Sequence, residues 1–316
     1  MNNNEQDLII DVGSNYGEFA LEIAARNPWV QVLAIEPNTN LSKKIKETSD
    51  FKNITNIELI NYAIDKNEGT CSFHISDHAD SGISSLLEFE KDKINNDPYW
   101  SNRTDLHFDH KIEVQVKRLD SILNDKKINK IRFIKIDAQG VDLNVLESLG
   151  SYLEITDAGM LEVPGTLENN LYSGETADLK KTLNTITKFG FKIYAIKPND
   201  HAANEFNIFF CKENICWKKM EEELHLKNLN LYDGKNYWHY PSNKWEPVEA
   251  KINELMDKAA ELNKARITLE FKIEKYQLVI KEQNIELKRI LKDNAYLHSL
   301  FSVRMRSFFK SLIMRK

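Results

Sequence analysis

Cysteine is scarce in this sequence, whose 316 residues include only Cys71, Cys211 and Cys216. Three cysteines cannot build a disulfide framework, which favours a reducing compartment, and we interpret them as small packed residues. No apolar run approaches the roughly 20 residues of a membrane span, and residues 1–5 have neither the basic nor the apolar region of a signal peptide. We therefore expect a cytoplasmic protein.

Basic residues are outnumbered, and the formal net charge of −5 excludes a strongly basic nucleic-acid binder, so we expect no nucleic-acid partner. This average hides an asymmetry along the chain. Residues 1–248 contain 39 acidic and 28 basic residues, whereas residues 294–316 contain five basic residues and no acidic one. The charges therefore indicate an acidic body that ends in a basic segment. Spacings typical of a hydrolase triad, a P-loop or an iron–sulfur site are also absent.

Short apolar strands alternate with helical segments over the first two thirds of the chain. Strands are predicted at 7–12, 31–35, 57–63, 131–136, 159–163, 191–196 and 206–211, and helices at 17–26, 41–48, 142–149 and 176–189. This alternation predicts an α/β fold with a mostly parallel sheet. Only a loop separates the last two strands, so we expect one of them to be antiparallel. Residues 66–120 break the alternation and are predicted to form an insertion over one face.

The C-terminal part carries a heptad repeat that no proline or glycine interrupts. From Ile252 to Leu297 all a and d positions are apolar except Arg266, Gln283 and Asn294. A seam sustained over this length predicts a coiled coil, and therefore a homo-oligomer, with dimer and trimer both open. The alternative is a single long helix packed on the acidic body.

The last residues differ from the repeat. One helical face of this basic segment gathers Phe301, Met305, Phe308 and Leu312. Aromatic residues with cations and no acids are typical of an interfacial helix, which predicts peripheral contact with the inner face of the cell membrane. A helical cap or partner-docking segment is the alternative.

These observations divide the chain into four parts. Residues 1–211 form the α/β domain, 212–248 a helix and an aromatic connector that packs on it, 249–297 the coiled coil and 298–316 the basic amphipathic tail. We prefer a packed connector to a substrate platform because aromatic side chains in such a stretch bury large areas.

The strand at 7–12 runs into a glycine turn that precedes a helix: Asp11-Val-Gly13-Ser-Asn15-Tyr-Gly17. Such a turn lets a ligand approach the backbone, and the helix start supplies free N–H donors. Glu36 follows Gly17 by 19 residues, at the end of the next strand, where its carboxylate can accept hydrogen bonds from a ribose diol. The pattern predicts a cofactor that contains adenosine.

The glycine pattern also favours one cofactor over another. Dinucleotide sites usually read G-x-G-x-x-G, whereas this turn reads G-x-N-x-G and lacks the third glycine. Asp11 can hold the ammonium of an amino-acid moiety, and Asn15 can contact its carboxylate. The sequence therefore favours S-adenosylmethionine over NAD.

A second polar cluster follows the strand at 131–136. We expect Asp137 at the carboxyl edge of the sheet, near the methyl donor, as the base that removes the acceptor's proton or as a metal ligand. Lys135 or Gln139 would orient the acceptor, and Glu162 is a second catalytic acid on the same edge. Asp142 is expected to cap its helix or to place a negative charge in its first turn.

Several motifs in this order resemble the FkbM family of S-adenosylmethionine-dependent methyltransferases, over about residues 8–211. They are Asp11 to Gly17, Ile35-Glu36-Pro37, Ala63-Ile-Asp65 before Gly69, Ser84-Ser85-Leu86, Leu119-Asp-Ser-Ile-Leu123, Phe133-Ile-Lys-Ile-Asp137-x-x-Gly140 and Leu161-Glu-Val163. The resemblance implies a class I, Rossmann-like methyltransferase fold and O-methyl transfer to a sugar or natural product. It also implies a cofactor role for Asp65. Many members have Glu where this chain has Gln139, which weakens a two-acid metal scheme.

The predicted function is therefore O-methylation of a sugar hydroxyl in a surface polysaccharide or glycolipid. Two alternatives are an NAD-dependent oxidoreductase or epimerase and a non-catalytic coiled-coil scaffold of a polysaccharide assembly complex. No metal ligand is assigned. Two polar-loop groups could supply ligands, His74 with Asp77 and His78, and His107 with Asp109 and His110, but no cysteine accompanies them at zinc-finger spacing. The sequence leaves a divalent metal open.

Overall fold

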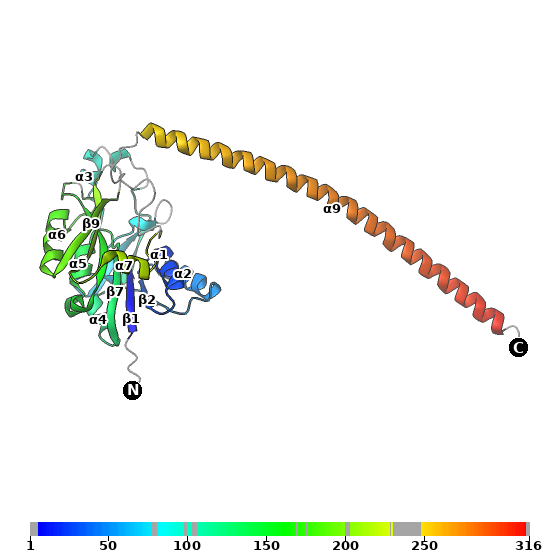
Figure 1. Cartoon of the computed structure of the whole chain (residues 1–316), viewed down its shortest axis with the longest axis horizontal. Helices are drawn as coiled ribbons and strands as arrows, with labels where there is room; N and C mark the ends of the chain where they lie inside the picture. The colour runs from blue at the N-terminus through cyan, green and yellow to red at the C-terminus, as the bar shows by residue number, and fades with distance from the viewer. Residues whose placement is uncertain are drawn as a thin grey trace. The chain divides into compact units, whose positions relative to one another are not determined.

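The computed structural model describes residues 6–76, 81–97, 100–102, 106–168, 170–174, 176–199, 203–227, 229 and 248–313. Contacts divide the chain into two units, residues 1–242 and 243–316. The first unit contains a mixed sheet with helices, and the second contains one long helix (Figure 1).

The described part of the first unit is built on a seven-stranded sheet of order β3-β2-β1-β7-β8-β10-β9. Its strands are β1 Gln6–Val12, β2 Gln31–Ile35, β3 Ile57–Ile60, β7 Ile128–Ile136, β8 Ala158–Pro164, β9 Phe191–Pro198 and β10 Glu205–Lys212. The first five pair in parallel, and β10 is antiparallel to both β8 and β9. The predicted, mostly parallel sheet with one antiparallel strand is confirmed.

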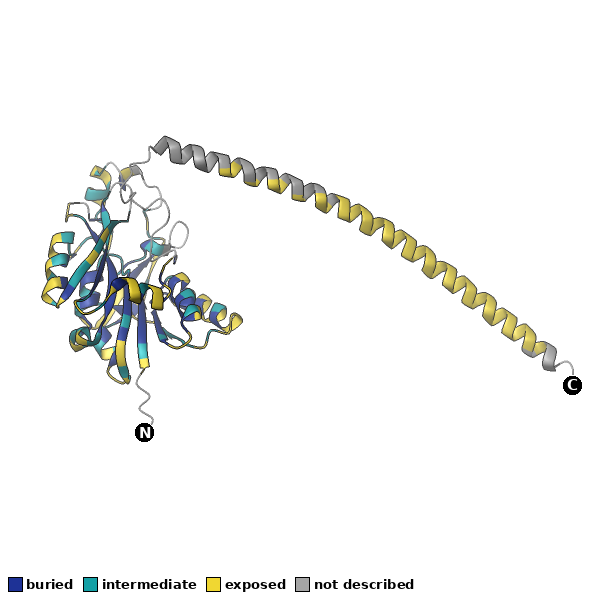
Figure 2. Cartoon of the chain, in the orientation of Figure 1, coloured by how far each residue is buried: buried dark blue, intermediate teal, exposed yellow. Residues whose placement is uncertain are grey.

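Helices cover both faces of this sheet. The described helices of the unit are α1 Glu18–Arg26, α2 Thr39–Phe51, α3 Lys91–Asn96, α4 Leu119–Leu123, α5 Asp142–Glu147, α6 Leu179–Lys188 and α7 Trp217–Glu223. Strand side chains alternate between the faces: Ile10 packs in a core with α4, α5 and α6, and Ile9 in a core with α1 and α7. Figure 2 shows the buried strands between more exposed helices.

The folded unit continues beyond residue 211. Trp217 and Met220 of α7 are buried in the core on the α1 face, together with Leu224, Leu226 and Leu229. The helix predicted after residue 211 is therefore part of the α/β unit. The aromatic connector at 232–247 lies outside the described residues.

The insertion predicted at 66–120 contributes two strands to a second, three-stranded sheet of order β4-β6-β5, whose strand β4 precedes it. Its strands are β4 Ala63–Ile64, β5 Gly69–Ile75 and β6 His110–Lys117. The single strand predicted at 57–63 was wrong, because the chain leaves the main sheet after β3 and enters the small one at β4. Asn61 lies at this step, where its side-chain amide donates a hydrogen bond to the Glu36 carbonyl oxygen at 3.2 Å.

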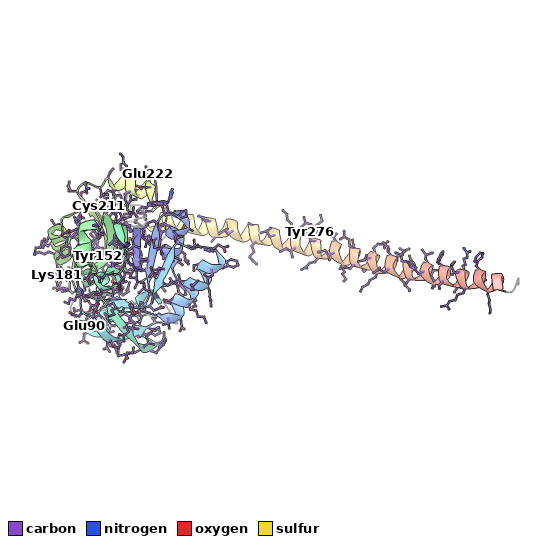
Figure 3. All side chains as sticks on the ribbon, turned by 90° about the horizontal axis from the view of Figure 1, so that it is seen from below. Glu90, Tyr152, Lys181, Cys211, Glu222 and Tyr276 are labelled. Atoms are coloured by element: carbon purple, nitrogen blue, oxygen red, sulfur yellow. The ribbon has the colours of Figure 1, made fainter. Side chains whose placement is uncertain are left out.

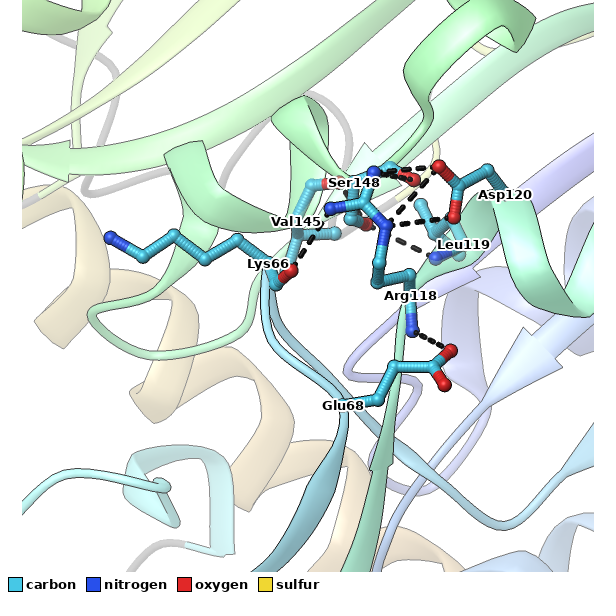
Figure 4. A network of polar contacts seen from close by, with 7 residues as sticks. All are labelled: Lys66, Glu68, Arg118, Leu119, Asp120, Val145 and Ser148. Atoms are coloured by element: carbon cyan, nitrogen blue, oxygen red, sulfur yellow. Dashed lines mark hydrogen bonds and ion pairs between the residues drawn. The ribbon is translucent and has the colours of Figure 1, made fainter.

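Arg118 connects the turn of the small sheet with the helix α4 that covers the main sheet (Figure 4). Its guanidinium contacts the Asp120 carboxylate at 2.6 and 2.9 Å and donates to the Lys66 carbonyl oxygen at 2.9 Å. Its backbone N–H donates to Glu68 at 3.2 Å. Because Lys66 and Glu68 lie in the turn between β4 and β5, this clamp fixes the turn against the start of α4.

Replacement of the clamp tests its contribution. We expect Arg118→Met to lower the free energy of unfolding by about 1–3 kcal/mol, since charged hydrogen bonds to Asp120 and a backbone carbonyl are lost together. The matched control is Lys46→Met, which removes the exposed Lys46–Asp50 pair of α2 and should cost no more than about 0.5 kcal/mol. Urea denaturation measures both; equal effects would contradict the clamp.

The second unit is the helix α9, Val248–Ile313, of 66 residues and about 100 Å in length. It has no break at residue 297, where the sequence predicted the coiled coil to give way to a separate tail. Its described side chains are exposed, as Tyr276 illustrates in Figure 3. Within the described residues, no helix combines the length and apolar character needed to cross a bilayer.

Candidate functional site

The turn after β1 has a left-handed backbone at Gly13, Asn15 and Gly17, with φ of 75°, 50° and 76°. A Cβ atom at Gly13 would lie 1.9 Å from the carbonyl oxygen of Asp137, and one at Gly17 would lie 2.8 Å from the Ile45 side chain. Both glycines are therefore required by close approach as well as by conformation. The turn brings backbone N–H groups of the α1 start to the carboxyl edge of the sheet.

Glu36 connects this turn with the end of β2. One carboxylate oxygen accepts from the N–H of Asn15 at 2.8 Å, and the other accepts from the N–H of Asn38 at 2.9 Å. The side chain is buried, and burial raises its pKa to about 7 despite these two hydrogen bonds. Glu36 thus fixes both loops while its other lone pairs stay available to a ligand.

These loops form one side of a pocket, here called the Glu36 pocket. The other sides come from Ala63, Ile64 and Phe73 of the small sheet, from Gly82, Ser84 and Leu86, and from Asp137, Ala138, Gln139 and Val141. The insertion therefore closes over the edge of the main sheet. Asp65 does not line the pocket; its carboxylate accepts from the N–H of Lys66 at 2.7 Å.

A buried row of charges lies beneath Asp137. Parallel register places Asp11 of β1 beside Lys135 of β7, and the Lys135 Nζ lies 3.5 Å from Asp11 Oδ1 and 3.3 Å from Asp137 Oδ2. Burial acts to lower the pKa of Lys135, but the two carboxylates raise it overall. Burial also raises the pKa of Asp11, although the Lys135 ammonium acts to lower it.

Lys135 is only 2% exposed and lines neither of the pockets described here. From the sequence we predicted that Lys135 lies next to the acceptor. The structure places it under Asp137, because strand alternation turns it to the α1 face with Asp11.

Gln139 holds the second oxygen of Asp137. Its side-chain N–H donates to Asp137 Oδ1 at 2.6 Å, and its side-chain oxygen accepts from the Tyr172 hydroxyl at 2.6 Å. Its carbonyl oxygen accepts from Ser85 Oγ, also at 2.6 Å. Because an ionised carboxylate only accepts hydrogen bonds, the amide can face Asp137 only through nitrogen, and Tyr172 fixes that orientation. Sequence reasoning missed Tyr172, since no local pattern connects it with Gln139.

A second pocket, here called the Glu162 pocket, shares Gln139 and Val141 with the first. Its wall is mostly polar and includes Lys66, Asp142, Asn144, Glu162, Asn170, Tyr172, Thr176, Lys181 and Glu205. Asn199 donates to Glu162 at 2.7 Å, and burial together with neighbouring Glu205 raises the pKa of Glu162.

Asp142 begins α5 and accepts from the N–H groups of Ala138 and Gly140 at 3.0 and 3.1 Å. These donors precede the helix, so Asp142 fixes the loop before α5 and is an acid of its first turn; the predicted N-cap contact is not formed. Burial raises its pKa to about 7.

Most of the predicted site residues meet at one sheet edge. Seven of them surround the Glu36 pocket or lie beneath it: Asp11, Gly13, Asn15, Gly17, Glu36, Lys135 and Asp137. Glu162 lines the adjacent pocket, and Asp65 lines neither pocket. In the parts of the chain that the structure describes, no group of three or more His, Cys, Asp or Glu side chains is placed to hold a metal ion.

The strand order is doubly wound, with antiparallel β10 between β8 and β9, and a pocket at the sheet edge lies between a glycine turn and an acid after β2. Together these features define a class I methyltransferase fold. The family model described as "Methyltransferase FkbM domain" matches residues 11–223. The chain belongs to the FkbM methyltransferase family.

Curated relatives are similar over part of the chain. The 2-O-methyltransferase NoeI of Sinorhizobium fredii is 24% identical over 143 residues, covering 44% of this chain and 56% of that protein. Methyltransferase 1 of Beauveria bassiana is 22% identical over 150 residues, covering 46% and 59%. The chain thus spans less than two thirds of the length of these relatives.

Solved structures are similar at low identity. An rRNA methylase from Streptococcus thermophilus is 12% identical, covers 66% of this chain and 87% of that chain, and superposes with a TM-score of 0.33. A ribosomal protein L11 methylase from Lactobacillus delbrueckii is 13% identical, covers 67% and 72%, and also has a TM-score of 0.33. The strand order and the family model define the fold of this chain.

Proposed function

We propose that the protein transfers a methyl group from S-adenosylmethionine to a hydroxyl of a sugar. The observation that carries this proposal is the arrangement of two pockets with a common wall at Gln139 and Val141, and with Asp137 in the first pocket beside that wall. A donor in one pocket and an acceptor in the other would meet at Asp137.

The Glu36 pocket suits S-adenosylmethionine. Gly13 and Gly17 leave room for close backbone approach, and Glu36 can accept from a ribose diol. Asp11 does not line this pocket, and its buried carboxylate already faces the Lys135 ammonium at 3.5 Å, so it supports the site from beneath. The bound cofactor supplies an electrophilic methyl group.

Asp137 is suited to take the proton that the acceptor hydroxyl loses during transfer. Lys135 holds Oδ2 and Gln139 holds Oδ1, so the carboxylate is fixed while lone pairs on both oxygens stay available. We infer that Lys135 acts through Asp137 rather than on the acceptor, since its ammonium is buried beneath it.

The Glu162 pocket supports a sugar as the acceptor class. Pockets for drug-like or apolar ligands are lined mainly by hydrophobic side chains, whereas this wall is dominated by carboxyl, amide, hydroxyl and ammonium groups. Such groups match a polyhydroxylated ligand. The name of NoeI, a 2-O-methyltransferase, supports transfer to oxygen. A surface polysaccharide or glycolipid is the proposed source of the sugar.

Labelled S-adenosylmethionine incubated with a panel of sugar acceptors tests the proposal, and label on a sugar oxygen supports it. Calorimetric titration with S-adenosylmethionine, S-adenosylhomocysteine and NAD runs alongside. Preferential binding of NAD would favour an oxidoreductase, and binding of none would favour a scaffold, so either result rejects the proposal.

Glu36 should make cofactor binding depend on pH. Its pKa of about 7 means that the carboxyl is protonated over a range in which an unshifted glutamate is ionised. If the ribose diol needs the ionised form, affinity for S-adenosylmethionine is highest above pH 7 and falls as the pH drops through that value, by up to about tenfold per unit.

We expect Glu36→Gln to bind more weakly and to lose this pH dependence. Asp142 also has a pKa of about 7 but binds the loop before α5 beside the other pocket, so Asp142→Asn should keep the pH dependence. Calorimetry over the pH range measures all three proteins. A pH dependence that disappears in Asp142→Asn and persists in Glu36→Gln would contradict the assignment of Glu36.

A further inference from the structure

The apolar face of α9 continues from the heptad repeat into the basic tail. The helix is unbroken from Val248 to Ile313. Beyond Leu297 the apolar positions Phe301, Met305 and Phe308 follow at spacings of four, four and three residues. This eleven-residue step takes about 3.67 residues per turn, close to a straight helix, so the stripe stays on one side.

The positions of these side chains support one continuous stripe. On a helix of 3.6 residues per turn, Leu287, Ile290, Leu297, Phe301, Met305 and Phe308 fall within an arc of about 80°. Phe301 is 67% exposed and Leu297 60% exposed on the described chain. The cations Arg306 and Lys310 fall on the opposite side of the helix.

The charges beside the stripe are compatible with a second copy of the same chain. In a parallel pair with matching register, each g residue lies near the e residue five positions later on the partner. The pairs are Lys258–Asn263, Ala265–Glu270, Lys272–Gln277, Val279–Asn284, Glu286–Leu291 and Asp293–His298. None joins like charges, whereas coiled coils that avoid self-pairing use like charges at these positions.

Asn294 adds a reason for this register. It occupies an a position, and a single asparagine there fixes register because it pairs with its counterpart across the seam. In a parallel pair, Asn294 meets Asn294 of another copy only when the two helices are not shifted.

We propose that residues 273–308 of α9 form one self-association surface, on which a second copy of this chain packs in parallel and in register. The aromatic side chains of the tail then belong to the interface between copies. Phe301 and Phe308 could not insert into a membrane while they pack in this interface, because the helix has no break that would turn them away from the seam.

Substitutions on and off the stripe test this surface in the full-length chain. Sedimentation equilibrium is expected to show an oligomer for the wild type. Phe301→Asp should weaken association at least about tenfold, which equals about 1.4 kcal/mol. Val303→Asp is the matched control, since Val303 is 61% exposed on the opposite side of the same turn, and it should leave association unchanged. Retained binding of S-adenosylmethionine confirms that each variant's α/β unit is folded.

A monomeric wild type, or equal effects of the two variants, would overturn the proposal. Register is tested by Leu297→Cys after the exposed Cys71 and Cys216 are changed to serine: a disulfide between copies is expected, and its absence in an oligomer overturns the parallel arrangement. Vesicles containing anionic phospholipid distinguish the other occupant. If Phe301→Asp abolishes vesicle binding but leaves the oligomer intact, the tail binds lipid and the proposal fails.

Discussion

Asp137→Asn is expected to lower methyl transfer by about 10²- to 10⁴-fold, because general-base assistance of this size is lost when the carboxylate becomes an amide. The amide can no longer take a proton from the acceptor hydroxyl. It also cannot accept at both positions from Lys135 and Gln139, which contact different oxygens of Asp137. Initial rates with labelled S-adenosylmethionine, on an acceptor found with the sugar panel, measure the effect.

Cofactor affinity distinguishes a chemical role from a structural one. We expect Asp137→Asn to keep the dissociation constant for S-adenosylmethionine within the same order of magnitude, since Glu36 and the glycine turn are untouched. The matched control is Asp125→Asn, an exposed aspartate after α4, which should change neither quantity. If Asp137→Asn keeps its rate, or loses cofactor binding to the same extent as rate, the assignment of Asp137 as base is wrong.

Gly13→Ala is expected to abolish cofactor binding and to lower the free energy of unfolding by about 2–4 kcal/mol. The new methyl group would lie 1.9 Å from the Asp137 carbonyl oxygen. Neither backbone segment can move freely, because the N–H of Asp137 donates to the Val12 carbonyl at 3.0 Å and the N–H of Gly13 donates to the Ile35 carbonyl at the same distance. The clash must therefore displace the turn that forms the pocket.

Gly190→Ala separates this clash from backbone strain. Gly190 has a φ of 78°, close to the 75° of Gly13, but the nearest atom to an added Cβ there is 3.9 Å away. It should cost only the roughly 1–2 kcal/mol of a left-handed alanine and leave cofactor affinity unchanged. Thermal unfolding and calorimetric titration compare the two. Similar losses in both variants would show that conformation alone, and not the approach to Asp137, requires glycine at position 13.

The strands and the glycine turn could be predicted because their signals are local. Buried runs such as 31–35 and 131–136 lie where β2 and β7 form, and the turn carries its own glycines. The break between β3 and β4 could not be predicted, since residues 57–63 contain no proline or glycine and only pairing with distant β6 separates the two strands.

Local signals also predicted some residues of the candidate site, whereas contacts between distant residues were missed. Asp137 follows from its place at a strand end, but the roles of its neighbours depend on contacts across the fold. Lys135 could have been placed correctly, because strand alternation puts it on the same face as Asp11 once β1 and β7 are paired. Tyr172 could not, since it reaches Gln139 from a loop 33 residues away.

The edge strands β3 and β9 of the main sheet face a risk of aggregation if copies of the chain are held together by α9. Tethering raises the local concentration of neighbouring sheets, and exposed edges are where sheets join and aggregate. β3 has only four residues, and β9 carries Lys192 and Lys197 and ends at Pro198. Short length, lysine and proline all discourage edge-to-edge pairing. These features protect the edges of the sheet when α9 brings several copies together. The chains can then associate through α9 without their sheets pairing into fibres.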